Sequence, residues 1–140
     1  MFSSFGARTA QLQGVPTVLA IPRRADRPLR NAAALAGTIA VITRGGCSFC
    51  EKATRAAEAG AVAVIFVNSD DEIFTVAPGE GEEGIAAAIA IPLVLVRQSD
   101  GAPLISSGNP PAVTVCYTDW PDELASDGED GQEVYGCVSR

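Results

Sequence analysis

The sequence contains no histidine and only one tryptophan among its 140 residues. A serine or cysteine nucleophile needs a nearby base, and histidine is the commonest one, so histidine-based catalytic triads are excluded. A zinc site would need all four cysteines, and Cys116 and Cys137 lie too far apart to form a second C-x-x-C knuckle. We therefore predict that the chain is not an enzyme and holds no metal or cofactor.

Long apolar runs are also absent from the sequence. No stretch reaches the ~18 consecutive apolar residues that favour a membrane span. Residues 1–13 lack the charged-then-apolar pattern of a secretory signal. We predict a chain that is not itself inserted in a membrane, and its compartment has to be inferred from other features.

Length and hydrophobic content predict one domain. At 140 residues with 47% hydrophobic content, the chain can bury a core of ordinary size. We divide it into an N-terminal extension, a folded domain and an acidic tail, at residues 1–13, 14–118 and 119–140.

Two apolar runs near the middle of the chain predict a strand-helix-strand unit. Thr38–Thr43 is mostly β-branched and Ala61–Val67 is similarly apolar, as strands buried on both faces are. Between them, Ser48 can cap a helix, and Glu51 three residues later can complete a capping box. We expect that helix to end at Gly60, because glycine is common just after the last turn of a helix.

The order of several motifs along the chain is informative. Gly37–Phe49 has the sequence GTIAVITRGGCSF, and it is followed by Lys52, Ala56, Ala59, Gly60, Ala61 and Asn68. Further on come Ile91–Val96 and then Asp100, Gly101, Leu104 and Ile105. This order resembles that of protease-associated (PA) domains over roughly residues 14–118. The upstream cysteine that many members pair with the cysteine of the RGGCSF segment is missing here.

The resemblance implies an α/β (α+β) fold, namely an open β-sandwich or partial barrel with two or three short helices. It also implies a domain that contacts a protein or peptide and has no catalytic residues of its own. In sorting receptors of the family, the loop ahead of the helix helps to form the ligand surface. The residues carried over to that surface by position are Arg44, Gly45, Gly46, Cys47 and Phe49.

The turn at residues 44–46 also has an interpretation from its residue types alone. Two glycines ahead of a helix N-terminus expose backbone N–H groups that can hold an anion. The segment lacks the lysine and hydroxyl residue of a phosphate loop, which favours a peptide carboxylate over a nucleotide. A tight turn without a ligand is the alternative.

Cys47 and Cys50 form a C-x-x-C pair at the start of the helix, which leaves two interpretations open. A thiol-disulfide oxidoreductase would use Cys47 as nucleophile and Cys50 as resolving thiol, since a helix dipole lowers a thiol pKa. Structural disulfides, Cys47 with Cys50 and Cys116 with Cys137, are favoured because the flanking Trp and Gly-Pro of thioredoxin-like proteins are missing. Such bonds predict the secretory pathway, either an organelle lumen or the exterior.

Residues 70–84 predict an exposed loop over the sheet. The segment is rich in Asp, Glu, Gly and Pro, and its carboxylates are expected to be solvated. It lacks the ligand pattern of a calcium-binding loop. Phe74 within it predicts either a partner contact or a place in the core.

Charge is divided unevenly along the chain. The net charge of −7 is concentrated in residues 119–133, which repels nucleic acid and anionic lipid. The acidic tail, residues 119–140, is either solvated or a docking arm for a basic partner, with Trp120, Val134 and Tyr135 as apolar anchors. Near the start of the chain, four arginines fall within eight residues, namely Arg23, Arg24, Arg27 and Arg30. They form either a solvated connector or a recognition loop.

Together these features predict a noncatalytic interaction module. We expect a soluble accessory or partner-binding subunit that contacts a protein or peptide within a larger assembly, including a membrane complex. Nucleic acid and direct membrane insertion are not expected. A thiol-disulfide oxidoreductase that uses the C-x-x-C pair is the alternative.

Overall fold

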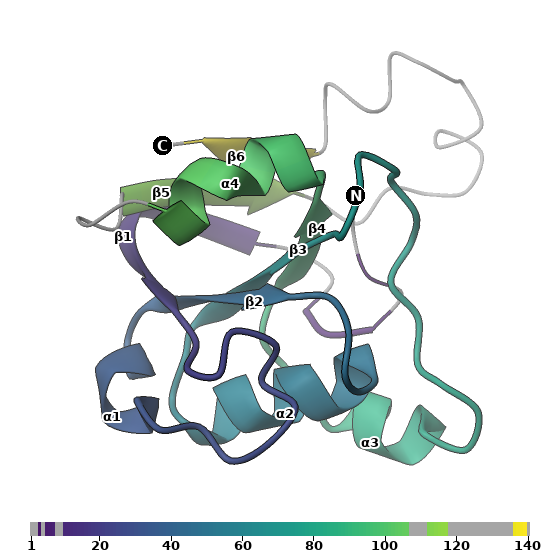
Figure 1. Ribbon diagram of the computed structural model, residues 1–140. Coiled ribbons are helices and arrows are strands. Elements are labelled where there is room, and N and C mark those ends of the chain that lie inside the picture. Colours follow the sequence, from purple (N-terminus) through teal and green to yellow (C-terminus); the bar gives the residue numbers. More distant parts are fainter. Residues whose placement is uncertain (1–2, 4, 8–9, 107–111, 118–135, 140) are drawn as a thin grey trace.

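The computed structural model describes residues 3, 5–7, 10–106, 112–117 and 136–139, and it shows a curled sheet flanked by short helices (Figure 1). The strands are β1 (Ala10–Leu19), β2 (Ile39–Thr43), β3 (Ala63–Val67), β4 (Leu93–Val96), β5 (Ala112–Tyr117) and β6 (Gly136–Ser139). The helices are α1 (Ala32–Leu35), α2 (Phe49–Glu58), α3 (Glu83–Ala87) and α4 (Gln98–Ser106).

The six strands form one sheet in the order β4-β3-β2-β1-β5-β6. Strands β1 to β4 are parallel, whereas β5 pairs antiparallel with both β1 and β6. The register between β1 and β5 shifts between Leu12 and Val15, where Gly14 has a φ of 61°. An irregularity of this kind bends a strand. The partial-barrel α/β fold predicted from the sequence is confirmed.

The core lies on both faces of the sheet, because the central parallel strands are buried on each side. On one face, alternate residues of β2 and β3 pack with Ala53 and Ala56 of α2. The other residues of these strands pack with Leu104 of α4 and with Val113 and Val115 of β5. Figure 1 shows α1, α2 and α3 on one side of the sheet and α4 on the other.

The strand-helix-strand unit forms as predicted. Ser48 Oγ accepts a hydrogen bond from the Glu51 amide at 3.2 Å and caps α2, which begins at the next residue. Gly60 has a φ of 91°, and its amide donates to the Ala57 carbonyl at 3.0 Å, which ends the helix. The structure contains four helices among its described residues, where the sequence predicted two or three. The additional ones are very short, so hydrophobic periodicity gives little signal for them.

The ends of the folded region differ from the sequence-based division. Strand β1 begins at Ala10, within the segment assigned to the extension, and Phe5 is only 8% exposed. Strand β6 lies within the segment assigned to the acidic tail. Among the described helices, none has the length and hydropathy that crossing a membrane requires.

Candidate functional site

The carboxyl ends of the parallel strands lie at one edge of the sheet, where ligands of α/β folds commonly bind. Arg44 follows β2 at this edge, and its side chain is exposed. Its Nη1 atom donates a hydrogen bond to Asn68 Oδ1 at 3.0 Å, just beyond the end of β3. Its guanidinium carbon lies 4.9 Å from the centroid of the Phe74 ring. The charged group is therefore fixed by two contacts while remaining open to solvent.

Asn68 holds this arrangement together. It is only 2% exposed, and its Nδ2 group donates to Asp70 Oδ1 at 3.1 Å and to the Glu72 carbonyl at 2.8 Å. Its Oδ1 also accepts from the Ser69 amide at 2.8 Å. One buried amide thus positions both Arg44 and the start of the loop that follows β3. Asn68 is part of the motif order that resembles PA domains, but it was not predicted as a site residue. A polar residue directly after an apolar strand could have indicated its role.

Three aromatic rings lie in contact below Arg44, with Phe74 directly under the guanidinium. The Phe49 ring lies 4.9 Å from the ring of the buried Phe66, in an edge-to-face arrangement. It lies 6.0 Å from the Phe74 ring. Phe49 and Phe74 both remain partly exposed, and Phe74 packs against the core, while its contact with a partner stays a prediction. We call Arg44, Phe49 and Phe74 the Arg44 surface.

The two glycines of the turn, Gly45 and Gly46, allow a second loop to pack against the turn. Gly45 and Gly46 have φ values of 112° and 84°, which glycine adopts without strain. A Cβ on Gly45 would lie 3.3 Å from Arg24 Nε, and a Cβ on Gly46 would lie 2.5 Å from Asp26 Oδ2. Both residues are therefore needed for the turn and for its contact with Ile21–Arg30, which we call the arginine loop.

The N-terminus of α2 already faces a carboxylate of the chain. Ser48 Oγ donates to Glu82 Oε2 at 2.7 Å, and Glu82 Oε1 accepts from the Gly79 amide at 3.0 Å. An incoming anion at this helix end would meet the Glu82 charge, which is repulsive. Among the charged groups of the Arg44 surface and the α2 N-terminus, Arg44 is the one suited to a partner's carboxylate.

Cys47 and Cys50 are free thiols, so the predicted disulfide between them is not formed. The two side chains enter different surroundings. Cys47 Sγ lies 3.7 Å from the Ala25 carbonyl and 3.8 Å from Arg55 Nη1, whereas Cys50 is fully buried. The charged group with the largest effect on Cys50 is Glu82, the residue just before α3.

Burial raises the pKa of both thiols above the ordinary cysteine value. For Cys47, the positive charge of Lys52 opposes this effect without overcoming it. The Glu82 charge raises the pKa of Cys50 further. A redox-active C-x-x-C pair needs a lowered thiol pKa, so these surroundings do not support the oxidoreductase alternative.

The remaining residues predicted for function lie elsewhere. Trp120 and Tyr135 lie outside the described residues. The backbone register places residues 116 and 137 directly opposite each other on β5 and β6, and the Cys116–Cys137 bond stays a prediction. Within the described ranges, no group of three or more His, Cys, Asp or Glu side chains gathers as a metal site would require.

The chain is similar in sequence to known proteins. The family model of the PA domain matches residues 9–104. The chain is 36% identical over 77 residues to signal peptide peptidase-like 3 of Oryza sativa subsp. japonica, which covers 55% of this chain and 14% of that protein. It is 48% identical over 59 residues to the PRADC1-like protein of Drosophila melanogaster, covering 42% of this chain and 30% of that protein.

A solved structure agrees in fold. A zinc aminopeptidase from Bacillus subtilis matches with a TM-score of 0.51 and 21% sequence identity, over 86% of this chain and 30% of that one. At this identity the likeness concerns the fold alone. This chain spans less than a third of the length of each of these relatives. Because the family model covers well over half of the chain, the protein belongs to the PA domain family.

Proposed function

We propose that this PA domain is a noncatalytic binding domain that contacts a protein or peptide partner through the Arg44 surface. The observation that supports this proposal most directly is the exposed Arg44 guanidinium, held in place by Asn68 and Phe74. A guanidinium has five N–H donors, and the hydrogen bond to Asn68 leaves others for a partner. A side chain that is already ordered loses less entropy on binding than a free arginine.

The partner groups that fit this surface are a carboxylate and an apolar side chain. Arginine binds carboxylates through paired charge-assisted hydrogen bonds. Phe49 and Phe74 offer partly exposed ring surface next to the charge. A peptide segment or chain terminus that places an acid beside an apolar residue satisfies both.

We also propose that the domain works as an accessory or partner-binding subunit beside a larger protein or assembly, including one at a membrane. The lengths of the relatives support this, because this chain matches 14% of one and 30% of another. One relative is named for signal peptide peptidase, which supports a place in the secretory pathway.

The cysteine register supports an oxidising compartment. Residues directly opposite on antiparallel strands have Cα atoms about 4.5–5.5 Å apart, within the range that a disulfide spans. Cys116 and Cys137 hold such positions. Mass mapping of the non-reduced protein should show one bond between these residues and free thiols at Cys47 and Cys50. Reduced Cys116 and Cys137 in protein isolated from its native source would contradict the compartment.

The binding proposal is tested by selecting peptides from a random library on the full chain and measuring their affinity. We expect Arg44→Ala to weaken the selected peptides by about tenfold, the worth of one good charge-assisted contact. Phe74→Leu should weaken them less, because it removes the ring and keeps an apolar side chain.

Arg97→Ala is the matched control for Arg44→Ala. Arg97 follows β4 as Arg44 follows β2, is also exposed, and lies 3.9 Å from Asp100. It should leave affinity unchanged. Equal loss in the two variants would indicate an effect of net charge, and no loss in either would overturn the proposed site.

A further inference from the structure

The arginine loop is more ordered than a connector between a strand and a helix requires. Three consecutive carbonyls of its backbone accept hydrogen bonds from side chains of other elements. The Arg23 carbonyl accepts from Thr43 Oγ1 at 3.2 Å and from the Thr43 amide at 2.7 Å. The Arg24 carbonyl accepts from Lys52 Nζ, and the Ala25 carbonyl accepts from Arg55 Nη1 at 2.8 Å.

The conformation held by these bonds is a costly one. Ala25 has a φ of 50°, a region that residues other than glycine seldom occupy, and it is fully buried. Lys52 is also fully buried, and its amine donates to the carbonyls of Arg24 and Gly45. Burying a charge opposes folding unless it is well paired. A backbone held this way points to a functional geometry in the loop.

The loop presents its arginines to solvent. Arg23, Arg24, Arg27 and Arg30 are all exposed, and Asp26 is the one acid within the same ten residues. Among the described residues, the ion pair found in this loop is Arg27 with Asp26, at 3.8 Å. The result is a fixed, positively charged surface on a protein whose net charge is −7.

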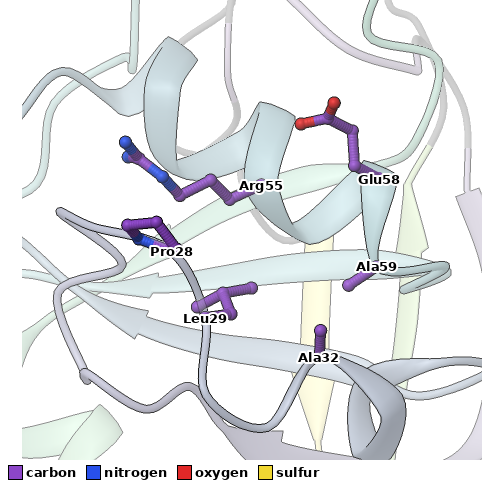
Figure 2. A pocket seen from close by; sticks show the side chains of 6 residues that line it. All are labelled: Pro28, Leu29, Ala32, Arg55, Glu58 and Ala59. Atoms are coloured by element: carbon purple, nitrogen blue, oxygen red, sulfur yellow. The ribbon is translucent and has the colours of Figure 1, made fainter.

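A shallow pocket lies beside the part of the loop that carries Arg27 and Arg30. It is lined by Pro28, Leu29, Ala32, Arg55, Glu58 and Ala59, from the arginine loop, α1 and α2 (Figure 2). Leu29, Ala32 and Ala59 supply apolar lining, and the charged groups of Arg55 and Glu58 extend from α2 beside it. Its volume of about 300 Å³ is at the lower limit for a small-molecule site, which suits one apolar side chain of a larger partner.

We propose that the arginine loop and this pocket form a second binding surface, for an acidic peptide segment of a partner protein. Carboxylates of the segment bind the guanidinium groups of Arg23, Arg27 and Arg30, and a neighbouring apolar side chain enters the pocket. Arginine suits this role because its planar fork pairs with both oxygens of a carboxylate. The preformed loop lowers the entropy lost on binding.

A peptide fits this surface better than a nucleic acid or an anionic membrane. The net charge of −7 repels extended polyanions. An apolar pocket next to the arginines adds affinity for a side chain and none for a phosphate backbone. The surface is distinct from the Arg44 surface, so either proposal can fail without the other.

The test is peptide selection from a random library on the full chain, with counter-selection on an Arg27→Ser/Arg30→Ser variant. We expect enriched peptides with several acids around one apolar residue, and about a tenfold or greater loss of affinity in the variant. Their affinity should fall steeply with added salt. Ala32→Met, which fills the pocket, should weaken peptides that carry the apolar residue and leave those without it unchanged.

Arg97→Ser removes an exposed positive charge outside this surface, so it is the control and should leave binding intact. Enrichment of peptides without acids, or equal affinity for the double variant, would overturn the proposal. So would the absence of any enriched peptide. Tighter binding of a single-stranded oligonucleotide or of phosphatidylserine vesicles than of any acidic peptide would also overturn it.

Discussion

Helix α2 positions a loop on each of its two sides, by different chemistry. On one side, Phe49 packs against Phe74, and Ser48 bonds to Glu82, which together hold the loop at residues 70–84. On the other side, Lys52 and Arg55 reach backbone carbonyls of the arginine loop. The first loop is held by aromatic packing and by hydrogen bonds from polar side chains, including those of Asn68. The second is held by two cations, the fully buried Lys52 and the half-buried Arg55. The difference leads us to expect that removing a cation loosens the arginine loop, whereas removing the aromatic contact loosens the loop at residues 70–84.

The largest effect should follow from removing the cation on the arginine-loop side. Lys52→Ala takes away both hydrogen bonds and leaves a cavity, and we expect the free energy of unfolding to fall by about 3 kcal/mol. Hydrogen exchange should speed up at the amides of Ala25, Arg30 and Thr43, which are bonded within or against the loop. Urea unfolding and exchange mass spectrometry measure the two effects.

Arg30→Ser is the control for Lys52→Ala. It removes a positive charge from the same loop at an exposed position, so stability should change by no more than about 0.5 kcal/mol. Uniform acceleration of exchange across the sheet in Lys52→Ala would mean that Lys52 supports the whole fold. In that case the contrast between the two sides of α2 would be lost.

The next effect concerns the aromatic side of α2. Phe49→Ala removes the contacts to both Phe66 and Phe74, and we expect a loss of about 2 kcal/mol, less than for a fully buried phenylalanine. Exchange should increase at residues 70–84 and stay unchanged in the arginine loop. Phe49→Leu should retain most of the stability, because an apolar side chain of similar reach remains. Faster exchange in the arginine loop of Phe49→Ala would show that the two sides are coupled.

A smaller effect should follow from breaking the polar link on that same side. Ser48→Ala removes the helix cap and the bond to Glu82, and we expect a loss of about 1 kcal/mol. Glu82→Gln keeps a hydrogen-bond acceptor and should cost less. A double-mutant cycle of Ser48→Ala with Glu82→Ala, which removes the acceptor, measures their coupling, and additive losses would show that the bond itself contributes nothing.

The sequence predicted the elements whose signals are local. Thr38–Thr43 and Ala61–Val67 are apolar runs, Ser48 is a cap and Gly60 a stop, and each was found close to its expected place. Arg44 and Phe49 were assigned to one surface through the family resemblance, and the contacts of Phe74 with them were not predicted. Contact between residues this far apart depends on how the strands pair, which local patterns do not determine.

The order of the arginine loop was not predicted, for a related reason. The four arginines indicated exposed charge, which a connector and a recognition loop share. What separates the two is Lys52, which helical spacing does not distinguish from a surface lysine. Its burial arises because its amine reaches carbonyls from the two segments at residues 24 and 45. The predicted disulfide between Cys47 and Cys50 is not formed, because Cys47 precedes α2 and faces the Ala25 carbonyl and Arg55, whereas Cys50, inside the helix, is buried.

The smallest expected effect is a shift in the pH dependence of thiol alkylation, and it should differ between Cys47 and Cys50. Because burial raises the pKa of Cys47 and Cys50, the half-maximal rate of alkylation by iodoacetamide should occur at higher pH than for free cysteine. The positive charge of Lys52 lowers the pKa of Cys47 but does not affect that of Cys50. Lys52→Met should therefore move the alkylation midpoint of Cys47 further up and leave that of Cys50 unchanged.

The raised pKa values of the thiols also predict the direction in which stability changes at alkaline pH. A thiol whose pKa is raised by folding stays protonated longer in the native state, so the stability it contributes is lost as pH rises past the ordinary thiol pKa. Burial lowers the pKa of Lys52, which acts in the opposite sense as pH rises. Comparing the wild type with Cys47→Ser and Cys50→Ser across alkaline pH isolates the thiol effect, and each variant should lose less stability than the wild type as the pH rises. A steeper loss of stability in either variant than in the wild type would contradict this assignment.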